Sequence, residues 1–158
     1  MNQEEQVLIT LRQIIRATDL YSRQLNKKSG LTAPQLLVLQ AIRDLGDVSI
    51  SKIAVAVSLS QATVTTIIDR LEARQLVCRK RSTVDKRVVH AALTDAGEAK
   101  LEAAPRPLQE EFSARFSQLE DWEQSMIVAA LQRVATMMNA EQIDASPMLH
   151  VGGAVPEE

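Results

Sequence analysis

Two adjacent segments govern the fold of this chain: Ser60-Gln-Ala-Thr-Val-Thr-Thr-Ile-Ile-Asp-Arg-Leu-Glu-Ala-Arg74 and Leu76-Val-Cys-Arg-Lys-Arg-Ser-Thr-Val-Asp-Lys-Arg-Val-Val-His-Ala-Ala-Leu-Thr94. The first places apolar residues at helical spacing behind Ser60, a favourable N-cap, and so predicts an amphipathic helix with a polar outer face. The second has residues of high β propensity on both sides of a charged tip, which predicts a hairpin with strands at 76–81 and 87–93. We therefore expect a polar-faced helix with a basic-tipped hairpin directly after it.

Helices are predicted on both sides of this pair. Thr32 and Thr94 are favourable N-caps for a second and a fifth helix, and Gly30 and Gly46 are suitable ends for the first and second. Two prolines, at 105 and 107, must kink or break the fifth helix. The expected order is four helices, a hairpin and two helices. Outside the quoted segments, the helical patterns cover residues 3–27, 33–45, 52–57 (capped by Ser49 or Ser51), 95 onward and 121–139.

This order predicts a mainly α fold with a small β-hairpin wing, in which a winged helix-turn-helix core is flanked by N- and C-terminal dimerisation helices. The last helix carries residues such as Trp122, Met126 and Leu131 around much of its circumference, more than one small domain can bury. Pairing across a two-fold axis would cover them, so we expect a homodimer. The predicted domains are the N-terminal dimerisation helix at 1–30, the winged helix-turn-helix at 31–97, the C-terminal dimerisation helices at 98–140 and a flexible tail at 141–158.

Composition places the chain among soluble proteins with a single core. It has 158 residues, 46% of them hydrophobic, which is too many for a disordered chain. One Cys allows no internal disulfide and fits a reducing compartment. The polar, acidic start is unlike a signal peptide, and no apolar run reaches the ~20 residues that span a bilayer. We expect a cytoplasmic protein that does not contact membranes.

The distribution of charge points to nucleic acid, although the net charge is only −2. Residues 49–93 carry eight basic and three acidic side chains, a net charge of +5, whereas residues 94–158 carry four basic and twelve acidic, a net charge of −8. Phosphate binding depends on the field within a Debye length of about 8 to 10 Å, and not on the total charge. The basic centre therefore predicts a face for double-stranded DNA.

The polar face of the predicted helix at 60–74 supplies candidates for base contacts, because the second helix of a helix-turn-helix enters the major groove. A Gln can pair with adenine and Thr methyl groups can pack on thymine, while the hydroxyls could instead contact phosphates, which fixes register without reading sequence. Taken alone, such residues would be ordinary solvent-facing ones, and the basic hairpin beside them is what favours DNA. The candidates are Ser60, Gln61, Thr63, Thr65 and Thr66, and Arg70 is expected to contact either a phosphate or a base.

The charged hairpin supplies candidates for backbone contacts. Arg79, Lys80, Arg81 and Lys86 are expected to neutralise phosphates, although a solvated charged turn would look the same on its own. Asp85 and Arg87 are two residues apart, so on an extended chain their side chains point to the same side.

With these features, the chain resembles the multiple antibiotic resistance regulator (MarR) family of bacterial transcription factors. The resemblance covers roughly residues 7 to 140, and its strength lies in an ordered set of motifs that are individually weak. The matching motifs are Leu31-Thr-Ala-Pro-Gln35, Ile50-Ser-Lys-Ile-Ala54, Ser60-Gln-Ala-Thr-Val-Thr65, Asp69-Arg-Leu-Glu-Ala73, Asp85-Lys-Arg87 and Leu93-Thr-Asp-Ala-Gly97.

The resemblance implies a homodimeric regulator, most often a repressor, that reads a pseudo-palindromic operator and can be relieved by a small-molecule effector. It also implies that Arg87 reaches the minor groove and that Asp85 helps to hold it. Two positions depart from the family pattern: Gln75 stands where many members have Gly, and Thr66 where some have Arg. Gln75 must then adopt a left-handed conformation, at a cost of about 1 kcal/mol, or end the helix differently.

Other classes of function are less well supported by the sequence. We find none of the GxGxxG, P-loop, HExxH or GxSxG motifs, so we expect no enzyme activity and no cofactor. The single Cys and two His offer no metal-ligand spacing, and Cys78 is interpreted as a structural residue. The remaining alternative is a helical adaptor or antirepressor that kept the fold and does not bind DNA.

Overall fold

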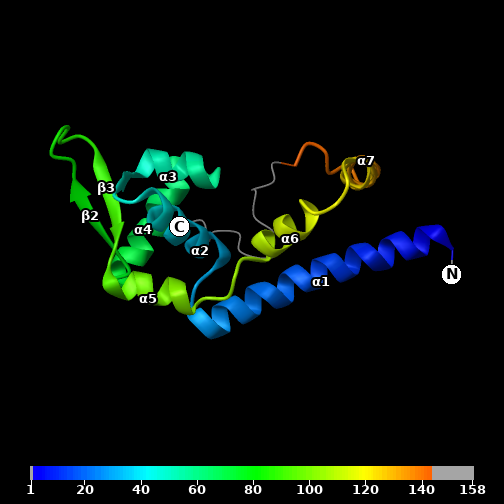
Figure 1. Cartoon of the computed structure of the whole chain (residues 1–158), viewed down its shortest axis with the longest axis horizontal. Coiled ribbons are helices and arrows are strands. Elements are labelled where there is room, and N and C mark those ends of the chain that lie inside the picture. Colours follow the sequence, from blue (N-terminus) through cyan, green and yellow to red (C-terminus); the bar gives the residue numbers. More distant parts are fainter. Residues whose placement is uncertain (1, 144–158) are drawn as a thin grey trace. The chain divides into compact units, whose positions relative to one another are not determined.

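A computed structural model describes residues 2–143, which form two compact units with the division after Pro105. The first unit holds five helices and a three-stranded sheet, and the second holds two helices (Figure 1). The elements of the first unit are α1 (Gln3–Ser29), α2 (Ala33–Leu45), β1 (Val48–Ser49), α3 (Ile50–Val57), α4 (Gln61–Ala73), β2 (Val77–Arg81), β3 (Val89–Leu93) and α5 (Asp95–Ala103); those of the second are α6 (Leu108–Phe116) and α7 (Asp121–Met137).

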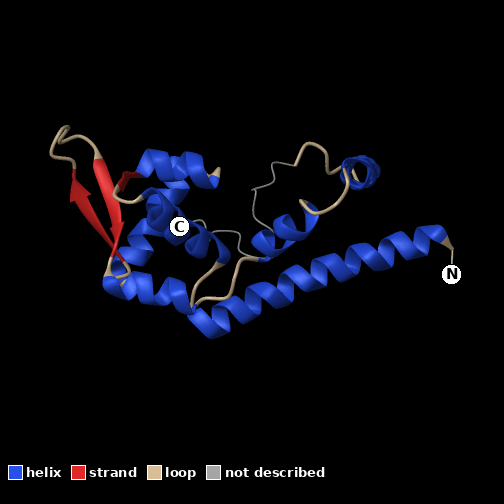
Figure 2. Cartoon of the chain, in the orientation of Figure 1, coloured by secondary structure: helices blue, strands red, loops and turns tan. Residues whose placement is uncertain are grey.

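The expectation of only two helices after the hairpin is wrong, because three follow it. A Pro has no N–H to donate and clashes with the preceding turn, so the prolines at 105 and 107 separate α5 from α6 completely. The mainly helical fold with a small wing is confirmed (Figure 2). The predicted domain roles stay a prediction, and the predicted tail at 141–158 lies almost wholly outside the described residues.

The predicted helix ends are confirmed by their capping bonds. Thr32 and Gln35 form a capping box, in which the Gln35 N–H donates to the Thr32 hydroxyl and the Gln35 side chain accepts from the Thr32 N–H. Ser60 caps α4 by accepting from the Thr63 N–H at 3.1 Å. Of the two candidate caps for α3, the structure uses Ser49. Because these bonds are local, they were readable from the sequence.

The sheet has one strand more than predicted. The two residues of β1 pair antiparallel with β3, so the strand order is β1-β3-β2 and β2 is an edge strand. The hairpin register places Arg79 opposite Ala91 and Lys80 opposite His90. Figure 2 shows the hairpin as arrows whose connecting loop extends beyond the helices of its unit.

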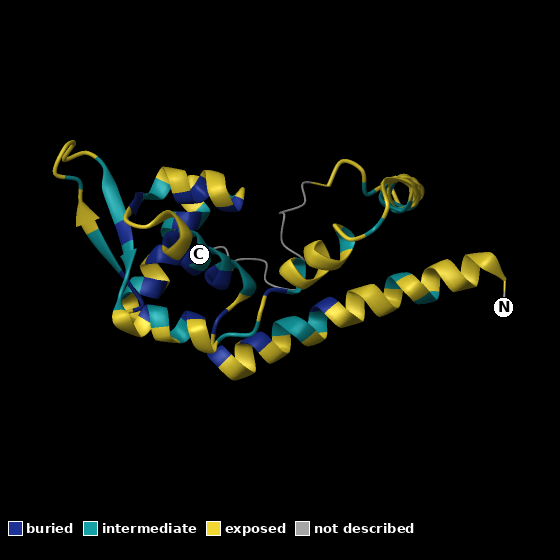
Figure 3. Ribbon diagram, viewed as in Figure 1, coloured by how far each residue is buried: buried dark blue, intermediate teal, exposed yellow. Residues whose placement is uncertain are grey.

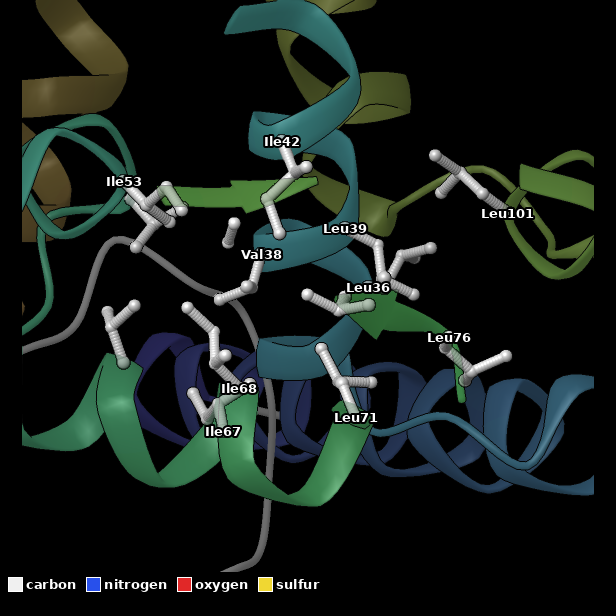
Figure 4. Close-up of a cluster of buried hydrophobic side chains, with 14 of the residues drawn as sticks. Leu36, Val38, Leu39, Ile42, Ile53, Ile67, Ile68, Leu71, Leu76 and Leu101 are labelled. Atoms are coloured by element: carbon white, nitrogen blue, oxygen red, sulfur yellow. The ribbon is translucent and has the colours of Figure 1, made fainter. Parts of the chain in front are cut away.

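The core of the first unit is an aliphatic cluster between α2 and α4. In Figure 4, Leu36, Leu39 and Ile42 of α2 lie over Ile68 and Leu71 of α4, and all five are buried. Each fully buried aliphatic side chain contributes about 1.5 to 3 kcal/mol relative to exposure. This packing fixes which face of α4 points inward and leaves the opposite face to solvent.

The junction between α4 and β2 is tightly constrained. Of the two alternatives for Gln75, the structure shows the left-handed conformation, with φ of 59°. The next carbonyl, that of Leu76, lies so close to Gly97 that a Cβ there would stand 2.0 Å from its oxygen. Only Gly fits that position of α5, and the close contact fixes where the hairpin leaves the helical core.

Large apolar side chains remain exposed on two of the longer helices. Figure 3 shows the first half of α1 as mostly exposed, and neither α6 nor α7 has a buried residue. These side chains follow helical spacing and are too numerous for isolated surface residues. They include Val7, Leu8, Ile14, Ile15 and Leu20 on α1 and Trp122, Met126, Val128, Leu131 and Met137 on α7.

No single helix within residues 2–143 combines the length and the hydropathy needed to cross a bilayer. The pair α3 and α4 meets both conditions only when taken together, and the two helices are bent by 110° at the turn between them.

Candidate nucleic-acid interface

The turn between α3 and α4 sets the direction of the polar helix. Ser58 adopts a left-handed conformation at φ of 52°, and the chain then reverses into α4 behind the Ser60 cap. Val64, Ile67, Ile68 and Leu71 are buried, as predicted from their spacing. The opposite face presents Gln61, Ala62, Thr66, Asp69 and Arg70 to solvent, with Thr63 and Thr65 half-buried at its borders.

The hydroxyl groups along this face are largely used within the helix. The Thr65 hydroxyl donates to the Gln61 carbonyl at 2.8 Å, and the Thr66 hydroxyl donates to the Ala62 carbonyl at 3.1 Å. Ser60 and Thr63 share a hydrogen bond between their hydroxyl oxygens at 2.7 Å. Because the hydroxyl hydrogens of Thr65 and Thr66 point into the helix, both residues offer a methyl group and an accepting oxygen to a ligand, and no donor.

The tip of the wing is organised by two short polar side chains. The Ser82 hydroxyl accepts from the N–H groups of Val84 and Asp85, and the Asp85 carboxylate accepts from the Arg87 N–H at 3.0 Å. A second bond, from the Val88 N–H to the Asp85 carbonyl, closes a turn. The expectation of an extended chain at Asp85 and Arg87 is therefore wrong: Asp85 makes an Asx turn that holds the backbone of Arg87.

The base of the wing is tied to α4 by an ion-pair cluster. The guanidinium of Arg79 on β2 donates to Glu72 at 3.0 Å and to Asp69, and the Arg79 backbone N–H donates to the other oxygen of Glu72 at 3.1 Å. Partial burial acts to lower the pKa of Arg79, but the hydrogen bonds and charges of the two carboxylates outweigh it and raise that pKa above the ordinary arginine value. The Arg79 guanidinium is therefore held between two carboxylates of α4.

The other predicted cations are not held in this way. Lys80 and Arg81 on β2, Lys86 and Arg87 at the tip, and Arg70 on α4 are exposed, and none forms an ion pair within residues 2–143. Long, mobile cations without carboxylate partners are the groups that neutralise phosphates at low cost. α4 and the wing together therefore carry five exposed cations that have no carboxylate partner among the described residues.

Two partners of this interface were missed from the sequence: the carboxylates of Asp69 and Glu72. Their spacing of three residues places them on one side of α4, but only the packing of β2 against α4 shows that they meet Arg79. A third link was also missed. Arg74, at the end of α4, donates to the Gly30 carbonyl at the end of α1, at 2.8 Å.

The single Cys and His90 lie on the two strands of the wing. Cys78 is half-buried in β2, and His90 lies across the sheet, with its Nδ1 atom 3.3 Å from the Asp47 carboxylate. Within residues 2–143, no three His, Cys, Asp or Glu side chains come together in an arrangement suited to a metal ion.

Comparison with known proteins identifies the family. A model of the MarR family matches residues 31–89, the segment from the start of α2 to the second wing strand. The HTH-type transcriptional regulator MgrA of Staphylococcus aureus is 37% identical over 98 residues, which are 61% of this chain and 67% of MgrA. The chain belongs to the MarR family. Its members in these comparisons are transcriptional regulators with a winged helix-turn-helix.

Two further relatives show how much of this chain is similar to other regulators. The HTH-type transcriptional repressor MdtR of Bacillus subtilis is 38% identical over 76 residues, 48% of this chain, so the match spans about half (49%) of MdtR. The solved structure of Bordetella bronchiseptica BpsR is 32% identical, with a TM-score of 0.53, over 82% of this chain and 98% of BpsR. That structure concerns the regulation of BpsR DNA binding by 6-hydroxynicotinic acid.

Proposed function

We propose that this MarR-family protein is a cytoplasmic, sequence-specific DNA-binding transcriptional regulator that represses its own or neighbouring genes as a homodimer. The observation that carries the proposal is the exposed polar face of α4 beside a wing with unpaired cations. A major groove about 12 Å wide admits an α-helix, and the wing lies where it can follow the adjacent backbone. The supporting relatives are named as regulators of transcription, and we expect no catalytic activity.

Base reading is assigned to the first three turns of α4. Gln61, exposed and beyond the Ser60 cap, offers the amide that pairs with adenine N6 and N7. Thr65 and Thr66 present methyl groups and accepting oxygens, because their hydroxyl hydrogens are bonded to carbonyls within the helix. Such a surface suits the thymine methyl group and the exocyclic amines of adenine and cytosine. Ser60 caps the helix and shares a hydrogen bond with the Thr63 hydroxyl, and Arg70 is assigned to the DNA backbone.

In the wing, Arg87 is the residue that we assign to the minor groove. The Asx turn at Asp85 holds its backbone, so the side chain projects from a fixed base although it is exposed. A preorganised cation gives up less entropy on binding than one on a flexible loop. Lys80, Arg81 and Lys86 would contact phosphates on either side.

The homodimer is supported by the exposed apolar faces of α1 and α7. Two copies related by a two-fold axis would place two copies of α4 on one side of a DNA duplex. Their half-sites would then lie about one helical turn, 10 to 10.5 base pairs, apart in a pseudo-palindromic operator. We therefore assign the dimerisation role to α1, α6 and α7.

A small-molecule effector is the remaining part of the proposal. The support is that DNA binding by BpsR, 32% identical to this chain, is regulated by 6-hydroxynicotinic acid. In this chain a shallow hollow lies along α1, lined by Ile9, Arg12, Gln13, Arg16, Ala17 and Leu20. An effector that binds one dimer state better than the other would shift the spacing of the two α4 helices and lower DNA affinity.

The decisive test is fluorescence anisotropy with DNA from upstream of the protein's own gene and its neighbours, at several salt concentrations. We expect nanomolar binding that tightens at low salt and exceeds binding to shuffled DNA by about a thousandfold or more. Arg87→Ala should weaken this binding strongly. Arg43→Ala removes an exposed cation from α2, outside the elements assigned to DNA and to the dimer, and should leave the affinity unchanged.

Each alternative has its own signature in that experiment. Equal affinity for specific and shuffled DNA would limit the protein to non-specific binding. No binding at any salt concentration would refute the regulator and support the adaptor or antirepressor. Equal losses in Arg87→Ala and Arg43→Ala would remove the wing assignment while leaving DNA binding intact.

A further inference from the structure

Arg79 differs from every other cation of the wing in its surroundings. Its side chain is 25% exposed and lies between two carboxylates of α4, those of Asp69 and Glu72. A guanidinium has five N–H donors in a fixed fork, and here two of its nitrogens are directed to two different acids. To contact a phosphate, this group would have to leave both partners.

Glu72 makes a second contact that involves the backbone of the wing. Its other carboxylate oxygen accepts from the Arg79 N–H, on the open side of the edge strand β2. An unpaired edge N–H would otherwise need water or another strand. Glu72 therefore binds both the side chain and the backbone of the same wing residue, and joins β2 to the last turn of α4.

Arg81 is a natural comparison within the same strand. It stands two residues further along β2, so its side chain leaves the same face as that of Arg79. It is exposed and forms no ion pair within the described residues. The two arginines share residue type, strand and face, and differ in their carboxylate partners.

We propose that Arg79 is a positioning residue that makes no phosphate contact: with Asp69 and Glu72 it fixes the base of the wing to α4, and so sets the placement of the wing relative to the base-reading helix on DNA. This proposal rests on the proposed function. The cluster lies at the base of the hairpin, where a small angular change is amplified at the tip that carries Arg87. A loose base would let the wing bind DNA only after ordering, at a cost in affinity.

The first arm of the test measures the wing without DNA. Amide hydrogen exchange over residues 77–93 is compared among the full-length wild type, Arg79→Gln, Glu72→Ala and Arg81→Gln, with thermal unfolding to confirm that each variant is folded. We expect about tenfold faster exchange in the hairpin for Arg79→Gln and Glu72→Ala, since local opening no longer breaks the cluster. Arg81→Gln should match the wild type.

The second arm measures affinity for the operator, or for any duplex the wild type binds. Glu72→Ala removes a negative charge near the DNA, so electrostatics alone predicts tighter binding. We expect the opposite, about tenfold weaker binding, because the wing loses its anchor. Asp44→Ala, which removes an exposed carboxylate elsewhere in the unit, should not weaken binding.

The salt dependence of binding separates the two arginines. A residue that neutralises one phosphate lowers the slope of log K against log salt by about 0.9 when it is removed. We expect that loss for Arg81→Gln and no loss for Arg79→Gln. Tighter binding by Glu72→Ala, or a salt slope and wing exchange for Arg79→Gln equal to those of Arg81→Gln, would overturn this inference alone. Failure of the wild type to bind any DNA would instead refute the proposed function, and the positioning role on DNA with it.

Discussion

At the scale of single residues, Gln75 shows how the chain tolerates a locally unfavourable conformation. Its φ of 59° costs about 1 kcal/mol in a residue with a Cβ. Backbone bonds hold it on both sides: its N–H donates to the Glu72 carbonyl at 2.8 Å, and its carbonyl accepts from the Thr94 hydroxyl at 2.6 Å. Both bonds involve only the backbone of Gln75, so they would persist if its side chain were removed.

We expect Gln75→Gly to raise the free energy of unfolding by about 0.5 to 1 kcal/mol, because Gly adopts this conformation without a steric penalty. The melting temperature should rise by about 2 to 4 °C for a chain of this size. Ala73→Gly is the control, since the same change within α4 should lower stability by about 1 kcal/mol. A loss of stability in Gln75→Gly would show that the side chain makes a stabilising contact.

At the scale of elements, α4 and the wing are both shaped by short polar side chains at their ends. Ser60 supplies the bond that starts α4, and Ser82 and Asp85 supply those that fold the wing tip. These contacts span two or three residues, so they form without help from the core. Val84 in the same tip is 96% exposed, so its apolar side chain does not pack against the core.

The wing tip gives a prediction about the role of Asp85. Asp85→Asn should keep DNA affinity close to that of the wild type, because the Asn carbonyl can accept the same bond from the Arg87 N–H. Asp85→Ala loses that bond and should weaken binding by about tenfold. Anisotropy at one salt concentration measures both. If Asn is as damaging as Ala, the negative charge of Asp85 is what matters.

At the scale of the whole molecule, basic charge and exposed apolar side chains occupy different segments of the sequence, the first in α4 and the wing and the second in α1 and α7. The acidic charge that lowers the total to −2 lies mainly after residue 93, outside the wing and α4. The exposed apolar side chains lie on α1 and α7, away from the unpaired cations in sequence. In the proposed function, this division would let one molecule bind a polyanion and a second copy of itself by different surfaces.

The dimer is tested by placing a charge on the exposed apolar face of α1. Ile15 is 56% exposed in the single chain, so Ile15→Glu should leave the fold intact. In a dimer it would bury an unpaired charge, so we expect monomers by analytical ultracentrifugation and a large loss of operator affinity. Val55→Glu is the control, because Val55 on α3 is 80% exposed. Dissociation by both variants, or by neither, would contradict the assigned interface.

The features of the fold that could be predicted from the sequence are those that depend on local interactions. Short-range hydrogen bonds form the helix caps at Thr32, Ser60 and Thr94, and the left-handed conformation of Gln75 is also local. The buried aliphatic residues of α4 recur at helical spacing. The order of helices and hairpin followed from these signals, as did the MarR-family resemblance. The break between α5 and α6 was underestimated, although both prolines were recognised.

The amino-acid sequence by itself determined most of the helices, their caps, the hairpin and the set of candidate DNA-contacting residues, because each depends on neighbours within a few positions. Only the tertiary structure decided which charges are engaged. Packing of the elements brings Arg79 to Asp69 and Glu72. It likewise brings Arg74 to Gly30, 44 residues away in the sequence. Ion pairs across a fold depend on the angle at which elements meet, and that angle is set by the whole core.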